Sequence, residues 1–529
     1  MKFMKKLICI TLTGILFISF TSCAVIKKTI SPDMIPQIGT FEELGYKNIR
    51  QFKATVSTAN DYISNQGLKH IGIIKAPYFT TYISGIEIPM YATAIYSGYN
   101  DAGVLHCFGT AEVELDQFPL NLKITAPIKT ADTTVLPKRN ISLKAEDKTI
   151  SAQISEYGFY TFIIDFPDQE YTCTIQIRQP SDETAEIQEY INQYGKENVT
   201  VLEAGQHQID YLILNNNSVL YLKRGAYITA THIHDINNTE DDVQKKDNRY
   251  NGRNAVLNAN NFENITIAGH GIIDMSMLDL HERNGLTFYQ GKNLTIKDIT
   301  LINSGNWNMY LYRVNNAVID NVTILGSRIN SDGINICNST NIAVSNCFIR
   351  TGDDCYSAKT LGAGTSAPTE NITFTNNIAW ASKARCFGIT GEVNFDIRNV
   401  TFENSTVITR DGTWDNDRIG SLVIIVEEGT GNIENITFRN INIAYDNGRA
   451  INLSVKNSER NHLSINQITF EDITYLSEMS SQLKATNETN NIHTTIKNVT
   501  ANGNPITVDN IDKYFIKDLS TCTIHILEN

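Results

Sequence analysis

The sequence predicts an all-β protein in which an N-terminal antiparallel β-sandwich precedes a parallel β-helix. The chain has 529 residues, which is too long for one ordinary compact domain. Asn occurs 8 times in residues 1–200 and 49 times in residues 201–529. Such a step in composition marks a change of architecture. In the second part a short Asn-containing motif recurs, which is typical of a solenoid.

The composition excludes some classes of protein. With 41% hydrophobic and 19% charged residues, the chain is not disordered throughout. Its net charge of −13 and the lack of a basic block exclude a duplex nucleic-acid partner. The acidic balance concerns solubility, and the oligomeric state is not predicted.

Residues 1–22 are expected to be an export signal. Three lysines precede the apolar run Leu7–Phe20, which is too short to span a membrane. Cys23 directly follows small residues and resembles a bacterial lipobox. We therefore expect lipidation of Cys23, a tether over residues 23–45, and an exported bacterial lipoprotein anchored to the outer or cytoplasmic membrane, periplasmic or at the cell surface. A plain signal peptide is the alternative.

Residues 46–180 read as short alternating strands separated by turns, which predicts the sandwich. Examples are Ala111–Leu115, Leu120–Ile124 and Tyr160–Ile164. In residues 181–196, apolar side chains recur at helical spacing and predict one amphipathic helix that caps the solenoid.

Residues 197–529 are predicted to form the β-helix. The repeated element is Asn, aliphatic, Thr or similar, then aliphatic or Phe, as in Asn264–Ile267, Asn293–Ile296, Asn341–Val344, Asn371–Phe374, Asn399–Phe402 and Asn435–Phe438. Asn suits the corners because it tolerates left-handed backbone conformations, and its amide can bond to the Asn of the next coil. A leucine-rich repeat is disfavoured because Leu is not regularly spaced.

One group of carboxylates stands out from the surface charges. Asp332 precedes Asp353 by 21 residues and Asp354 by 22. One coil has about that length, so the three should stack on one face of the solenoid. Clustered carboxylates repel, so at least one pKa must rise. A neutral acid beside an ionised base is what glycosidic cleavage requires.

The spaced motifs Asn330-Ser331-Asp332 and Gly352-Asp353-Asp354-Cys355 resemble those of right-handed β-helix glycoside hydrolases. The resemblance covers roughly residues 197–470 and points first to the dextranase/isopullulanase family and second to polygalacturonases. It implies inverting hydrolysis, with Asp353 as general acid and with Asp332 and Asp354 holding and deprotonating the water. Inversion generally needs carboxyl groups roughly 6.5–9.5 Å apart.

The chain departs from polygalacturonases beyond the aspartates. The stretch that begins at Arg385 lacks their histidine, and Arg418-Ile419-Gly420 lacks the lysine of their Arg-Ile-Lys. These missing cations would bind the galacturonate carboxylate. A neutral α-glucan or a related polysaccharide is therefore the first expectation. Galacturonan stays open because of a further set of basic residues: Lys359, Lys383, Arg385 and Arg418.

The residues predicted to contact substrate are Asn330, Lys359, Arg385, Trp307 and Arg418. Trp414, Glu392, Asp415 and Asp417 are further candidates. No cofactor and no metal are expected: His232 and His234 share a strand face without a third nearby ligand, and the cysteines follow no zinc pattern. A β-helix polysaccharide lyase and a non-catalytic glycan-binding lipoprotein remain alternatives.

Overall fold

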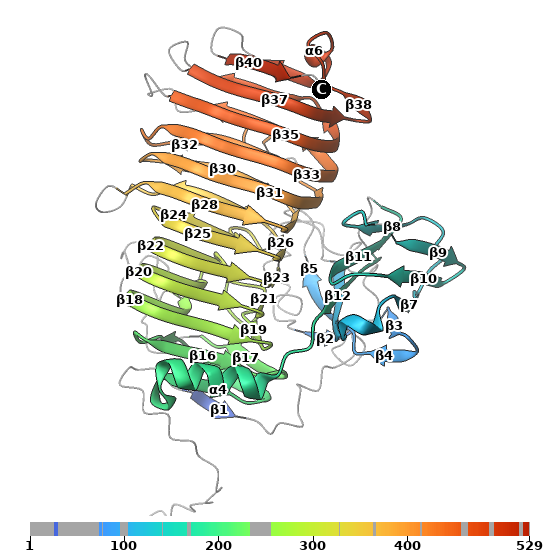
Figure 1. Cartoon of the computed structure of the whole chain (residues 1–529), viewed down its shortest axis with the longest axis vertical. Coiled ribbons are helices and arrows are strands. Elements are labelled where there is room, and N and C mark those ends of the chain that lie inside the picture. The colour runs from blue at the N-terminus through green and yellow to red at the C-terminus, as the bar shows by residue number, and fades with distance from the viewer. Residues whose placement is uncertain are drawn as a thin grey trace, which may run out of the picture.

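A computed structural model shows two β-rich parts joined by one helix (Figure 1). The predictions for the export signal, for Cys23 and for most of the tether lie outside the residues that the structure describes, as do residues 46–72. The described residues are 26–29, 73–76, 78–95, 104–139, 141–166, 171–232, 255–326, 328–362, 367–412, 415–455, 464–485, 491–517 and 522–527.

The N-terminal part consists of two facing sheets with strand orders β4-β3-β7-β10-β9 and β2-β5-β6-β12-β11-β8. Their pairings are antiparallel except that β12 runs parallel to β6. Alternate residues point inward, as in β7, and the inward sets form one core between the sheets. The elements are β2 (Ile74–Lys75), β3 (Thr80–Ile83), β4 (Ile86–Ile88), β5 (Tyr91–Ile95), β6 (Val104–Glu112), η1 (Leu115–Gln117), β7 (Leu120–Thr125), β8 (Thr133–Leu136), β9 (Ser142–Glu146), β10 (Thr149–Ile154), β11 (Gly158–Ile164) and β12 (Tyr171–Arg178).

The second part is a stack of coils in which strands pair in parallel with the equivalent strands of the next coil (Figure 1). The short strands β1 (Ile26–Thr29) and β38 are exceptions and pair antiparallel with β14 and β37. Both the β-sandwich and the parallel β-helix are thus confirmed. The strands of the first coils are β13 (Val199–Leu202), β14 (Gly205–Ile209), β15 (Leu212–Ile213), β16 (Ser218–Leu222), β17 (Ala226–Ala230), β18 (Ala255–Gly269), β19 (Ile272–Asp274), β20 (Asn284–Lys297), β21 (Thr300–Ile302), β22 (Met309–Asp320) and β23 (Thr323–Leu325). The later elements are β24 (Ile334–Cys337), β25 (Thr340–Ser345), β26 (Phe348–Thr351), β27 (Tyr356–Thr360), β28 (Thr369–Thr375), β29 (Ile378–Ala381), β30 (Arg385–Val393), β31 (Ile397–Arg410), β32 (Gly420–Glu428), β33 (Ile433–Arg449), β34 (Ile451–Val455), β35 (Ser464–Met479), β36 (Ser481–Ala485), β37 (Asn491–Ala501), β38 (Asn504–Pro505), α6 (Ile511–Tyr514), β39 (Phe515–Lys517) and β40 (Cys522–Leu527).

The repeated motif forms the corners and the core as predicted. Asn371 and Asn399 have positive φ angles of 58° and 56°. The Asn399 amide donates to the Asn371 side chain at 3.0 Å, and the ladder continues to Asn435 at 2.8 Å. Inside the coils, Phe374 and Phe402 stack with ring centres 4.7 Å apart. Because the ladder and the stack repeat from coil to coil, successive coils share one register.

The helix α4 (Glu183–Tyr194) joins the two parts. Asp182 accepts hydrogen bonds from two backbone N–H groups of the first turn, which accounts for its start there. Ile187, Tyr190 and Tyr194 pack on outward-facing residues of the first coils, such as Tyr221. The helix therefore covers the flank of these coils. In the described part of the chain, no helix is long and apolar enough to cross a membrane.

The sandwich packs against the side of the β-helix, next to the coil that carries the predicted aspartates (Figure 1). Arg350 of β26 is fully buried at this contact. Its guanidinium lies 3.6 Å from the centre of the Trp380 ring and 2.8 Å from His106 Nδ1 of the sandwich. Arg350 precedes Asp353 by three residues, so the sandwich buttresses the backbone that leads into the site. The seven described cysteines are buried, as expected of small core residues.

Candidate active site

Two consecutive coils carry the predicted aspartates, and the coil after them begins its strand at Arg385. Ile334 of β24 pairs with Tyr356 of β27, which pairs with Phe387 of β30. Asp332 lies two residues before Ile334 and Asp354 two residues before Tyr356, so the register stacks Asp332 on Asp354. The Gly333 N–H donates to the Asp354 carbonyl at 2.7 Å. The stacking predicted from a coil of 22 residues is what the backbone shows.

The carboxylates of Asp332, Asp353 and Asp354 form one cluster. Oxygens of the three side chains lie within 4.8 Å of one another. Asp332 and Asp354 are 3% and 1% exposed, whereas Asp353 is partly exposed. Asp353 is therefore the most accessible carboxyl group of the three. The nearest oxygens of the cluster are closer than the roughly 6.5–9.5 Å usual between the carboxyl groups of inverting enzymes.

Burial raises the pKa of two of these acids above the usual value of an aspartate. Burial raises the pKa of Asp353 well above 3.8, and the nearby charges of Asp332 and Asp354 raise it further. Burial also raises the pKa of Asp332 to about 6, although Lys359 opposes the increase. Asp353 is thus suited to donate a proton, and Asp332 is suited to accept one.

Two buried cations, Lys359 and Arg385, contact the two buried aspartates, Asp332 and Asp354. Lys359 Nζ lies 3.3 Å from Asp332 and 3.4 Å from Asp354. Arg385 Nη1 lies 3.3 Å from Asp354. The three carboxylates offer the oxygen ligands that a divalent cation prefers, but Lys359 already supplies positive charge between two of them. The arrangement therefore favours acid–base chemistry over metal binding.

Comparison with known proteins agrees with this chemistry. The model of the family described as glycosyl hydrolases family 28 matches residues 235–521, more than half of the chain. The chain belongs to glycosyl hydrolases family 28. It is a glycoside hydrolase by family, as the sequence predicted. Membership in family 28 corrects the order of the two resemblances, since that order was based on a few missing cations and on the N-terminal β-sandwich and not on the whole repeat domain.

Individual relatives of this family 28 chain match over shorter stretches. Endopolygalacturonase A of Aspergillus niger is 30% identical over 173 residues, which are 30% of this chain and 43% of that one. The α-L-rhamnosidase rgxB of A. niger is 28% identical over 151 residues, 26% of this chain and 34% of that one. The chain thus spans less than half of the length of either relative.

The fold has a solved counterpart. Dex49A from Penicillium minioluteum has a TM-score of 0.56 and 12% identity, covering 86% of this chain and 95% of that one. The similarity extends through the N-terminal sheets as well as the β-helix, so it supports the whole two-part architecture of this family 28 member.

The remaining substrate-contact predictions have different outcomes. The Trp307 ring centre lies 4.9 Å from Lys359 Nζ, so Trp307 borders the aspartates. Asn330 is exposed at the rim, where its amide lies 3.0 Å from His281 Nε2. Arg418 joins the site indirectly, because it and Arg385 contact the same carboxylate, that of Glu427.

The other candidates surround this centre. Glu392 lies 3.6 Å from Lys359, Asp415 lies 3.9 Å from Arg418, and Asp417 lies 4.0 Å from Arg449. Trp414 lies outside the described residues.

Sequence reasoning missed two polar neighbours of the predicted site residues. Asn335 donates to Asp332 Oδ2 at 2.9 Å, and Glu427 binds Arg385 and Arg418. The spacing of three residues between Asp332 and Asn335 was a weak available signal. Glu427 lies near the end of β32, and Glu392 lies near the end of β30 on the preceding coil. This similar position of two glutamates was a second weak signal for Glu427.

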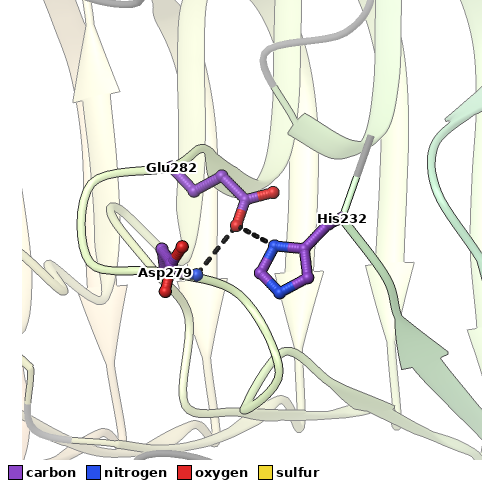
Figure 2. A group of neighbouring side chains, drawn as sticks. All are labelled: His232, Asp279 and Glu282. Atoms are coloured by element: carbon purple, nitrogen blue, oxygen red, sulfur yellow. Dashed lines mark hydrogen bonds and ion pairs between the residues drawn. The ribbon is translucent and has the colours of Figure 1, made fainter. Parts of the chain in front are cut away.

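A separate group of polar side chains joins the loop between β19 and β20 to His232, which follows β17. Glu282 Oε2 lies 2.8 Å from His232 Nδ1 and accepts a 2.8 Å hydrogen bond from the Asp279 backbone N–H (Figure 2). The tertiary structure thus supplies His232 with acidic neighbours that sequence spacing did not indicate, while His234 lies outside the described residues. These contacts fasten the loop to the end of β17.

Proposed function

We propose that this protein hydrolyses α-glycosidic bonds of a polysaccharide with inversion of the anomeric centre. The observation that supports this most directly is the partly exposed Asp353, whose pKa is raised, beside two buried aspartates paired with Lys359 and Arg385. A protonated acid and an adjacent ionised base are the two groups that the reaction needs.

In the proposed mechanism, Asp353 donates its proton to the glycosidic oxygen as the bond to the anomeric carbon breaks. Asp332 and Asp354 orient a water molecule and remove its proton as the water attacks that carbon. Lys359 and Arg385 hold these two side chains in place. The short distances within the cluster make the product anomer, followed by NMR from the first turnover, the direct test of inversion.

The general acid is tested by Asp353→Asn. The amide keeps the size of the side chain but cannot donate the proton, so release of reducing ends should fall by about 10²–10⁴-fold. The exposed Asp132 of the sandwich supplies a matched control, Asp132→Asn, which should retain full activity. An Asp353→Asn variant that is as active as the control would refute the assignment.

For the sugar next to the cleaved bond we favour a neutral residue, because the chain lacks the histidine and lysine that the family resemblance places around a galacturonate carboxylate. The second candidate is galacturonan, which the name of the A. niger endopolygalacturonase supports. Incubation with dextran, pullulan and polygalacturonate, together with nitrophenyl α-L-rhamnoside, separates these candidates.

We also propose that the protein acts outside the cytoplasm as a lipoprotein anchored through Cys23. The support is the basic and apolar N-terminal segment followed by a small-residue stretch that ends at Cys23. Mass spectrometry of the membrane fraction tests this, since Cys23→Ser should release an unlipidated protein.

A further inference from the structure

Among the described residues, Lys359 and Arg385 contact the proposed catalytic aspartates, and each also pairs with a glutamate. Lys359 contacts Asp332, Asp354 and Glu392 at 3.3, 3.4 and 3.6 Å. Farther from Asp332 lie Arg385 and Arg418, two of the four basic residues that the sequence suggested for an anionic pocket. Their shared partner determines whether they can receive a charged sugar.

That partner is Glu427 at the end of β32. Its Oε1 accepts a hydrogen bond of 2.6 Å from Arg385 Nη2 and one of 2.9 Å from Arg418 Nε. Its Oε2 accepts from Arg418 Nη2, which completes a two-pronged contact. The side chains of Glu427 and Arg418 are 24% and 36% exposed, so the group lies within reach of a ligand.

The charge state of Glu427 is consistent with this contact. Burial acts to raise the pKa of Glu427, but the hydrogen bond from Arg418 and the charges of Arg385 and Arg418 outweigh it and lower the pKa. The carboxylate is therefore ionised at neutral pH. It sits on the two arginines as the carboxylate of a uronic acid would.

We infer that Glu427 is a built-in substitute for a substrate carboxylate and restricts the site to uncharged sugars. A uronate would have to displace a tethered carboxylate from both arginines. It would also add a negative charge near Asp354 and Glu392, which repel it. A neutral sugar meets no such repulsion, and the accessible Glu427 oxygens can accept hydrogen bonds from its hydroxyl groups.

This inference rests on the proposed function, and binding measurements separate the two. In the Asp353→Asn background, calorimetry with trigalacturonate should show only weak binding. Adding Glu427→Gln removes the competing charge but keeps the side-chain shape. It should tighten trigalacturonate binding by roughly tenfold or more at low salt. Raising the ionic strength to about 0.15 M should reduce the gain, because exposed charges are screened.

Two further variants control the interpretation. Glu428→Gln removes a charge from the next, exposed residue and should leave trigalacturonate binding unchanged. Glu427→Asp retains a carboxylate and should show little of the gain, and circular dichroism verifies that each variant is folded. In the active protein, Glu427→Gln should shift the preference from neutral nitrophenyl α-glycosides toward trigalacturonate.

The outcomes are distinct. Tight binding of trigalacturonate by the Asp353→Asn protein with Glu427 intact would overturn the inference, as would a folded Glu427→Gln variant with no gain. Hydrolysis of polygalacturonate by the unaltered protein would also overturn it but would leave the proposed glycosidase standing. If no glycoside releases product, the proposed function fails, and the binding arms still decide the role of Glu427.

Discussion

Burial of Asp332, which we propose activates the water, should lower the stability of the fold at neutral pH. Its pKa is raised from the usual 3.8 to about 6, with burial as the main cause. A shift of roughly 2 units corresponds to about 3 kcal/mol, the free energy by which the folded state disfavours the charged form. Asn has nearly the same shape and no charge, so Asp332→Asn should remove this cost.

Proton linkage determines how this effect on the free energy of unfolding changes with pH. Because the folded pKa lies above the unfolded one, the native state binds the proton more tightly. The stabilising effect of the neutral form is complete below about pH 4 and is lost as the pH rises through 6. Asp332→Asn should therefore match the unaltered protein near pH 4 and exceed its free energy of unfolding by up to about 3 kcal/mol near pH 8. Hydrolysis should be largely lost in the same variant.

Urea unfolding followed by tryptophan fluorescence at several pH values measures this difference. The Lys359 ion pair lost in the variant is already included in the net pKa of Asp332. Asp132→Asn, at an exposed position of the sandwich, should show no such pH-dependent gain. A variant whose advantage is absent at pH 8, or equally large at pH 4, would refute the assignment of a raised pKa to Asp332.

Two further predictions concern the pH optimum and the corners. The rate should rise with pH through about 6, as Asp332 loses its proton, and fall when Asp353 ionises; a rising limb centred near pH 4 would contradict this. Asn371 has a φ of 58°, so Asn371→Ala should cost about 1–2 kcal/mol more than Asn371→Gly, which loses the ladder bond without the strain. Equal urea midpoints for the two variants would contradict this explanation.

Much of the architecture could be predicted because it is local and repeated. Each Asn-aliphatic-Thr motif corresponds to one corner and one strand. The aligned ladder from Asn371 to Asn435 follows from that repetition. The same regularity placed Asp332 on Asp354, since the coil between them has the usual length.

Contacts that depend on irregular coils were beyond the sequence. The coil from Tyr356 to Phe387 spans 31 residues, compared with 22 for the coil before it. The extra length sets where Arg385 and the following coil meet the aspartates. For this reason the charge partner of Arg385, 42 residues away at Glu427, could not be read from spacing. The pairing of Arg350 with His106, 244 residues apart, depends likewise on how the sandwich docks.

The sequence alone determined the two-part all-β architecture, the coil register and the stacking of the three aspartates proposed to be catalytic, because all of these depend on periodic patterns along the chain. Only the tertiary structure decided how the charges of the site are balanced: which acid stays accessible, which two are held by Lys359 and Arg385, and which carboxylate occupies the outer arginines. Electrostatic pairing depends on distances and burial in space. In a solenoid with coils of unequal length, those distances are set by packing.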